Sequence, residues 1–231
     1  MLSNGIVSFT GNNTYGLTTN TDSHMMKNSE WGSVAYLSHS SYGINDEIRI
    51  NNYWNNGPKT GCGASEENGE ETNTCQIAYG GASSYPQSTT GNISGVFDMS
   101  GGAFEYVMGV LADDSGNPRS GNSTDWNSGF NGLLPDGTSY ISGIAFPSSK
   151  YYDLYTSQNS LTACNGGVCY GHALSETAGW YLDYADFVRP VDPWFGRGGG
   201  HLNGSDAGAW FSNVGYGNAG VFSWRSVLVA E

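Results

Sequence analysis

The clearest periodic pattern of hydrophobic positions lies in residues 25–40. Polar residues that often cap helices, Thr21, Asp22 and Ser23, precede it, and Gly43 follows it. The pattern predicts an amphipathic helix over residues 25–40 whose apolar side packs on a core. The positions that recur at helical spacing are Met26, Trp31, Val34, Ala35 and Leu37.

A second pattern covers residues 92–109 and predicts two strands joined by a tight turn at 98–102. In the second strand Phe104, Tyr106 and Met108 alternate with other residues. We expect Asp98 to bond backbone amides of the turn. Glu105 stands among apolar neighbours, so it needs a partner if it is buried.

Turn-forming residues interrupt the pattern over most of the remaining chain, especially in residues 45–91 and 111–160. The 231 residues include 35 Gly, 15 Tyr and 7 Trp, while only 13% are charged. This composition favours an irregular, loop-rich fold with short strands. Because no linker or internal repeat divides the chain, we expect one domain over residues 1–231.

The formal net charge of −13 is spread over a chain with only eight Lys and Arg residues, and these are scattered. Nucleic-acid binding needs a basic patch, so we expect no nucleic-acid partner. No apolar run is long enough to cross a bilayer, so we expect no direct membrane insertion by this segment. The first residues read as the middle of a longer sequence, and the sequence leaves open an export signal, anchor or stalk outside it.

The four cysteines form two local pairs, Cys62 with Cys75 and Cys164 with Cys169. The chain has no C-x-x-C spacing, which argues against zinc or thioredoxin-type chemistry. Two short-range disulfides are predicted, and these imply an oxidising compartment. Four reduced thiols in a cytosolic protein remain the alternative.

The spacing of the candidate catalytic and metal-binding residues gives little support to any particular site. His172 and Glu176 have i, i+4 spacing but no evident third ligand. Asp183 and Asp186 could form a carboxylate pair for a glycosidase, although capping or pairing with Arg189 is the simpler interpretation. The acidic run Glu66, Glu67, Glu70 and Glu71 lacks the ligand spacing of an EF-hand loop and reads as a solvated loop.

The tail of the chain mixes Gly, Asn and Ser with aromatic residues, and two fixed-looking segments, 197–204 and 223–228, bracket it. Aromatic rings supply contact area at low entropic cost, and small polar residues adapt their hydrogen bonds. The composition therefore suits a surface that binds a partner. A core hairpin that happens to hold aromatic residues is the alternative.

Three separated motifs resemble one family. Residues 95–106, GVFDMSGGAFEY, resemble the GLYDMxGNVWEW signature of formylglycine-generating-enzyme-like domains, which are a branch of the C-type lectin fold. Residues 197–199 are similar to the RGGS strand of those domains, and residues 223–225 to their closing GFR. The resemblance implies a C-type lectin-like α+β fold, loop-rich, with short antiparallel strands and one or two helices.

Within that fold, the tail resembles the variable proteins of diversity-generating retroelements, in which mutation at adenines of an Asn-rich template diversifies the end of a lectin-like domain. The resemblance implies a variable region over residues 197–228. Trp210 departs from the scheme, because changing the first two bases of an Asn codon cannot produce Trp. The implied diversified, ligand-binding positions are Gly200, His201, Leu202, Ser205, Asp206, Trp210, Ser212, Val214, Gly215, Tyr216, Gly220, Val221 and Phe222.

The resemblance implies a ligand-binding protein rather than an enzyme, displayed on a bacterial cell, pilus or phage, with an unknown protein or glycan as partner. It implies no cofactor, although it leaves open whether the protein binds calcium. One alternative is a carbohydrate-binding lectin module. Another is a formylglycine-generating oxidase, which is disfavoured because no cysteine pair follows Cys169 to hold copper. The candidate calcium ligands are Asp98, Asp113, Asp114 and Asp136.

Overall fold

The protein is a mixed α+β structure with one α-helix among its described residues. The computed structural model describes residues 21–55, 57, 59–60, 77–116, 148–156, 169–174, 180–190, 192, 194–214 and 222–229. Its α-helix and strands are β1 (Asp22–Met25), α1 (Asn28–Ser38), β2 (Phe104–Leu111), β3 (Asp153–Tyr155), β4 (Trp194–Gly198), β5 (Gly208–Val214), β6 (Phe222–Trp224) and β7 (Ser226–Val229). Short 3-10 turns lie at η1 (Tyr53–Asn55), η2 (Ala82–Gln87), η3 (Ser149–Tyr151), η5 (Trp180–Leu182) and η6 (Gly204–Asp206).

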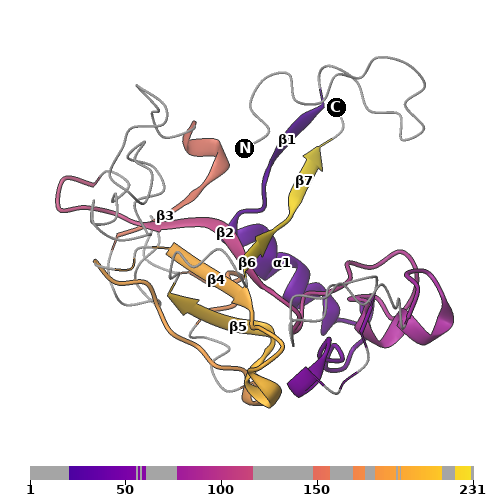
Figure 1. Ribbon diagram of the computed structural model, residues 1–231. Helices are drawn as coiled ribbons and strands as arrows, with labels where there is room; N and C mark the ends of the chain where they lie inside the picture. Colours follow the sequence, from indigo (N-terminus) through magenta and orange to yellow (C-terminus); the bar gives the residue numbers. More distant parts are fainter. Residues whose placement is uncertain are drawn as a thin grey trace, which may run out of the picture.

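The central sheet is built around β2, which pairs with three other strands (Figure 1). Along one path the strand order is β3-β2-β4-β5, with β4 antiparallel to both of its neighbours. β3 and β6 both pair with β2 in parallel, β6 at residues 104–106 and β3 at residues 109–111. The tail therefore contributes β5 and β6 to this sheet.

The predicted helix is confirmed, but it begins later than expected. Residues 22–25 form β1 instead of a cap, because β7 offers them an antiparallel partner. The amide of Lys27 donates to the Glu30 carboxylate (2.8 Å) at the true start of the helix. Trp31 is fully buried, as expected, whereas Leu37 is 45% exposed.

Of the two strands expected in residues 92–109, only the second is formed, as β2. Residues 92–95 are turns instead. The Asn92 side chain accepts the amide of Ser94 (2.8 Å), and the Ser88 hydroxyl donates to the Asn92 carbonyl (2.6 Å). These local bonds compete with strand pairing, so the prediction of a first strand was wrong.

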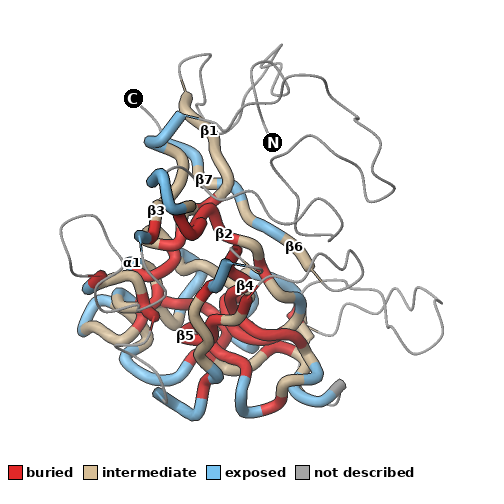
Figure 2. The backbone as a smooth tube through the Cα atoms, turned by 90° about the vertical axis from the view of Figure 1, so that its left-hand side faces the viewer, coloured by how far each residue is buried: buried red, intermediate tan, exposed pale blue. Residues whose placement is uncertain are grey.

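The core lies between α1 and the β2–β4–β5 part of the sheet, where the tube is almost continuously buried (Figure 2). Trp31 occupies its centre and donates its indole N–H to the Ala209 carbonyl (2.8 Å). Arg197 is also fully buried; it donates to the Ala173 carbonyl (2.6 Å) and lies 5.8 Å from the Trp31 ring centre. The first residue of the RGG motif is thus part of the core.

Candidate functional site

The turn that opens β2 is held in place from two sides. Gly101 and Gly102 have φ values of 74° and 76°, the left-handed region that glycine adopts without strain. The amide of Gly101 donates to the Gly198 carbonyl (2.9 Å). Asn51 donates its amide to Ser100 (2.7 Å) and accepts that of Gly102 (3.0 Å). A Cβ at Gly101 would lie 2.5 Å from the Asn51 carbonyl oxygen, so no larger residue fits.

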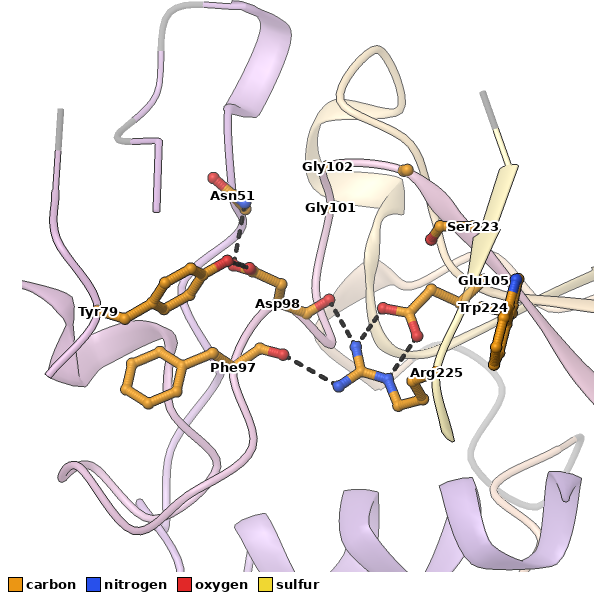
Figure 3. A pocket seen from close by; sticks show the side chains of 11 residues that line it. Asn51, Tyr79, Phe97, Asp98, Gly101, Gly102, Glu105, Ser223, Trp224 and Arg225 are labelled. Atoms are coloured by element: carbon orange, nitrogen blue, oxygen red, sulfur yellow. Dashed lines mark hydrogen bonds and ion pairs between the residues drawn. The ribbon is translucent and has the colours of Figure 1, made fainter. Parts of the chain in front are cut away.

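The Asp98 side chain points away from its own turn, toward two donors from other segments (Figure 3). Asn51 donates its side-chain amide to Oδ1 (3.0 Å), and the Tyr79 hydroxyl donates to Oδ2. The expectation that Asp98 bonds backbone amides of the turn was therefore wrong. Burial raises the pKa of Asp98, against the opposing effect of these hydrogen bonds.

Glu105 has the partner that its buried position requires. Its side chain is almost fully buried, and Arg225 donates to both carboxylate oxygens through Nε and Nη2. Arg225 also donates to the carbonyls of Phe97 (3.2 Å) and Asp98 (3.3 Å). Burial raises the pKa of Glu105, and the Arg225 guanidinium acts in the opposite direction. The closing motif of the tail is thus bonded to the turn and strand of the first motif.

A pocket of about 540 Å³ opens beside this ion pair (Figure 3). The rings of Tyr79 and Trp224 line it and are 55% and 49% exposed. Phe97 stands edge-on to Tyr79, with 5.4 Å between ring centres. The polar part of the lining includes Asn51, Asp98, Glu105, Ser223 and Arg225.

Both ends of the tail lie at the border of the pocket. The amide of His201 donates to the carbonyl of Gly102, a pocket-lining residue (2.8 Å). At the other end, β6 runs parallel to β2 and brings Ser223 and Trp224 to the pocket wall. The Phe222 ring, which is half-buried, stacks on Tyr106 with ring centres 4.6 Å apart.

The first turn of the tail, residues 201–206 (the tail turn), is accessible to solvent. Leu202, Ser205 and Asp206 are exposed, and His201 is half-buried. Gly200, in contrast, is buried, and a Cβ there would lie 2.9 Å from the Phe104 ring. Its predicted place on the exposed surface was wrong.

The expectation of exposed side chains in β5 was also wrong. Trp210 and Ser212 are 1% exposed and Val214 is 2% exposed. The Trp210 ring lies edge-on to Tyr36 and Trp180, each 4.8 Å away. The amide of Ser212 donates to the Tyr184 carbonyl (2.9 Å), so the 183–186 segment covers the outer edge of the strand. Gly215, Tyr216, Gly220 and Val221 lie outside the described residues.

Aromatic residues that sequence reasoning missed flank the tail turn on both sides. On one side Trp54, 52% exposed, donates its amide to the His201 carbonyl (2.9 Å). On the other, Tyr184 donates its amide to the Asp206 carbonyl (2.9 Å). Trp54 and Tyr181 have positive φ, which is uncommon for bulky residues. In the sequence, the aromatic residues within 180–184 were the signal that could have indicated this side of the tail turn.

Asp183 and Asp186 have different surroundings. Asp186 pairs with Arg189 (2.8 Å), as the simpler interpretation predicted. Asp183 is buried and accepts the amide of Trp210 (2.8 Å). Burial raises its pKa to about 8. Asp183 therefore supports β5 from within the fold.

Two of the remaining candidate residues, His172 and Asp113, form hydrogen bonds within the protein. His172 shares a hydrogen bond with the Tyr155 hydroxyl (2.7 Å), and Asp113 accepts the amide of Ser115 (2.9 Å). The described residues contain no cluster of three or more His, Cys, Asp or Glu side chains able to hold a metal ion. Glu176, Asp136 and the acidic run 66–71 lie outside the described residues.

Cys169 is disulfide-bonded. Cys62, Cys75 and Cys164 lie outside the described residues, so the local pairing stays a prediction.

Comparisons with known proteins identify no family: no family model matches the chain, and no curated protein does. Within the ranges that the structure describes, no helix is long and apolar enough to cross a bilayer.

Proposed function

We propose that this chain is a ligand-binding protein with a C-type lectin-like fold, in which a diversifiable tail turn and a neighbouring pocket form the binding face. The observation that carries the proposal is the division within the tail. Residues 201–206 form an accessible turn at the pocket, whereas 208–214 form a buried strand behind it.

The packing of the three motifs supports the lectin-like fold. Glu105 of the first motif pairs in register with Arg197 of the second and forms an ion pair with Arg225 of the third. Gly101 of the first motif also donates to Gly198 of the second. Segments about 100 residues apart in sequence thus form one connected unit, as is expected if the three motifs belong to one fold.

The exposure of the tail turn supports a diversifiable surface. Substitutions at exposed positions usually change stability by less than about 0.5 kcal/mol. Leu202, Ser205 and Asp206 meet this condition, and His201 meets it in part. The exposed rings of Trp54 and Tyr184 lie beside them and would supply contact area at low entropic cost. As a variable protein, this chain would be displayed on a bacterial cell, pilus or phage.

A carbohydrate-binding lectin module is the second candidate. The observation that favours it is the pair of exposed rings, Tyr79 and Trp224, on a pocket that also presents Asn51 and Asp98. A formylglycine-generating oxidase is disfavoured by the sequence, because no cysteine pair follows Cys169 to hold copper.

A display library tests the proposal and does not require the natural ligand to be identified. His201, Leu202, Ser205 and Asp206 would be randomised together, and the displayed proteins selected against a protein unrelated to this chain, such as hen lysozyme. The expected result is that most members resist protease as the parent does, and that selection yields binders that lose binding when the four positions are reverted.

The matched control library randomises four positions of β5 instead: Ala209, Trp210, Ser212 and Val214. Because these side chains are buried, most of its members should be degraded by protease. If the tail-turn library unfolds as often as the β5 library, or yields no binders that depend on the four positions, the proposal is wrong.

A further inference from the structure

The charged residues that line the pocket are two acids, Asp98 and Glu105, and one base, Arg225. Glu105 and Arg225 neutralise each other, and Arg225 also donates hydrogen bonds to the carbonyls of Phe97 and Asp98. Four of the five N–H donors of its guanidinium are thereby bonded within the protein. Among the ion pairs of the described residues, no Lys or Arg pairs with Asp98. The pocket therefore favours a positive charge.

The Asp98 carboxylate is fixed in position but keeps room for a further donor. Asn51 and Tyr79 hydrogen-bond to it. A carboxylate has about four acceptor positions, and these two donors from the described residues do not fill them. These donors orient the group before any ligand arrives, which lowers the entropic cost of binding.

Aromatic rings form the other chemical feature of the pocket. The faces of Tyr and Trp rings attract cations, and Tyr79 and Trp224 both line the pocket with about half of their surface exposed. A guanidinium suits this combination, since it stacks on aromatic rings and also donates to carboxylates. The volume of about 540 Å³ is within the range of small-molecule sites and accommodates one long side chain.

We infer that this pocket receives a cationic side chain of the partner protein, best an arginine, with its guanidinium at Asp98 and against the rings of Tyr79 and Trp224. This inference rests on the proposed function, because it names the partner group that would enter beside the tail turn. The net charge of −13 adds a long-range attraction for a basic partner.

The test uses the full chain and Nα-acetyl-L-arginine methylamide as the probe, with binding followed by NMR of the tryptophan indole N–H groups. The citrulline analogue, Nα-acetyl-L-citrulline methylamide, has nearly the same shape without the charge. The arginine probe should bind about tenfold more tightly than the citrulline probe. Equal binding of the two probes would overturn the inference.

Three variants test which residues produce the preference for the arginine probe. Asp98→Asn should abolish the preference for arginine, and it suits the positive φ of 61° at this position, because Asn tolerates that conformation. Trp224→Leu removes an exposed ring and should weaken arginine binding severalfold. Asp46→Asn removes the same charge from an exposed position outside the pocket lining and the tail turn, and it should change little.

Two results for the variants would overturn the inference. One is a preference for arginine that survives Asp98→Asn in a protein with an unchanged circular dichroism spectrum. The other is an equal loss with Asp46→Asn, which would mean unspecific electrostatic attraction. Displacement of the probe by a neutral methyl glycoside, unaffected by Asp98→Asn, would assign the pocket to sugars instead. Failure of the tail-turn library together with success here would reject only the diversifiable tail.

Discussion

At the scale of single residues, buried carboxylates distinguish this protein. Asp98, Glu105 and Asp183 all lie in surroundings where burial raises the carboxyl pKa. Glu105 has an arginine partner, and Asp98 has side-chain donors. Asp183 has its pKa raised to about 8, and it accepts the amide of Trp210 in β5. Its protonation is therefore coupled to the stability of the tail strand.

The raised pKa of Asp183 predicts a specific pH dependence of folding. Between the ordinary pKa of 3.8 and about 8, the folded state holds a proton that the unfolded state has released. The contribution of Asp183 to stability is thus present at low pH and is lost as the pH rises toward 8, by at most about 1.4 kcal/mol per pH unit.

Urea unfolding of the wild type and Asp183→Asn, measured from pH 4 to 8.5, checks this prediction. The stability difference between the two proteins should shift in favour of the variant as the pH rises. Asp206→Asn, at an exposed carboxyl, is the control and should show no such shift. A difference that is constant with pH would contradict the assignment.

At the scale of secondary-structure elements, the tail consists of a turn that tolerates change and a strand that does not. β5 is hydrogen-bonded to β4 on one edge and covered by residues 183–186 on the other. The turn at 201–206 is held mainly through its backbone, by bonds to Gly102, Trp54 and Tyr184. Side chains on that turn can therefore vary while its path is kept.

This division predicts opposite results for two tryptophans. Trp210→Ser should destabilise the protein by about 3–5 kcal/mol, because it leaves a cavity beside Tyr36 and Trp180. Trp224→Ser, at a ring that is 49% exposed, is the matched control and should cost much less. Leu202→Ser should lie within about 0.5 kcal/mol of the wild type.

Chemical denaturation of the three variants gives the comparison directly. Equal losses for Trp210→Ser and Leu202→Ser would mean that the turn and the strand are alike, contrary to the structure.

At the scale of the whole molecule, distant segments are joined by a few polar links around a single tryptophan. Arg197 and Arg225 lie 5.8 Å and 5.4 Å from the Trp31 ring. β1 and β7 pair, so that the early and late parts of the described chain lie side by side (Figure 1).

Reduction of the disulfides should lower the free energy of unfolding, by about 2–4 kcal/mol for each bridge, because the unfolded chain gains freedom. Thermal unfolding with and without a phosphine reductant measures the change. Peptide mapping without reduction should show Cys164 joined to Cys169 and Cys62 joined to Cys75. Unchanged stability on reduction would contradict a structural role, and crossed pairing would contradict the local pairs.

Some features followed from the sequence alone. The helical spacing around Trp31 predicted α1, and the alternation from Phe104 to Met108 predicted β2. The apolar neighbours of Glu105 predicted that it would need a partner. Each of these depends on residues close together in the chain, where side-chain spacing or local burial carries the information.

Only the tertiary structure decided which residues meet. Arg225 as the partner of Glu105, Tyr79 as the donor to Asp98, and β7 as the neighbour of β1 all come from distant segments. The same holds for the tail: composition could not separate the accessible turn from the buried β5, because the cover of β5 comes from α1 and residues 180–186. Burial is a property of what packs against a residue, and in this irregular fold that neighbour is seldom nearby in sequence.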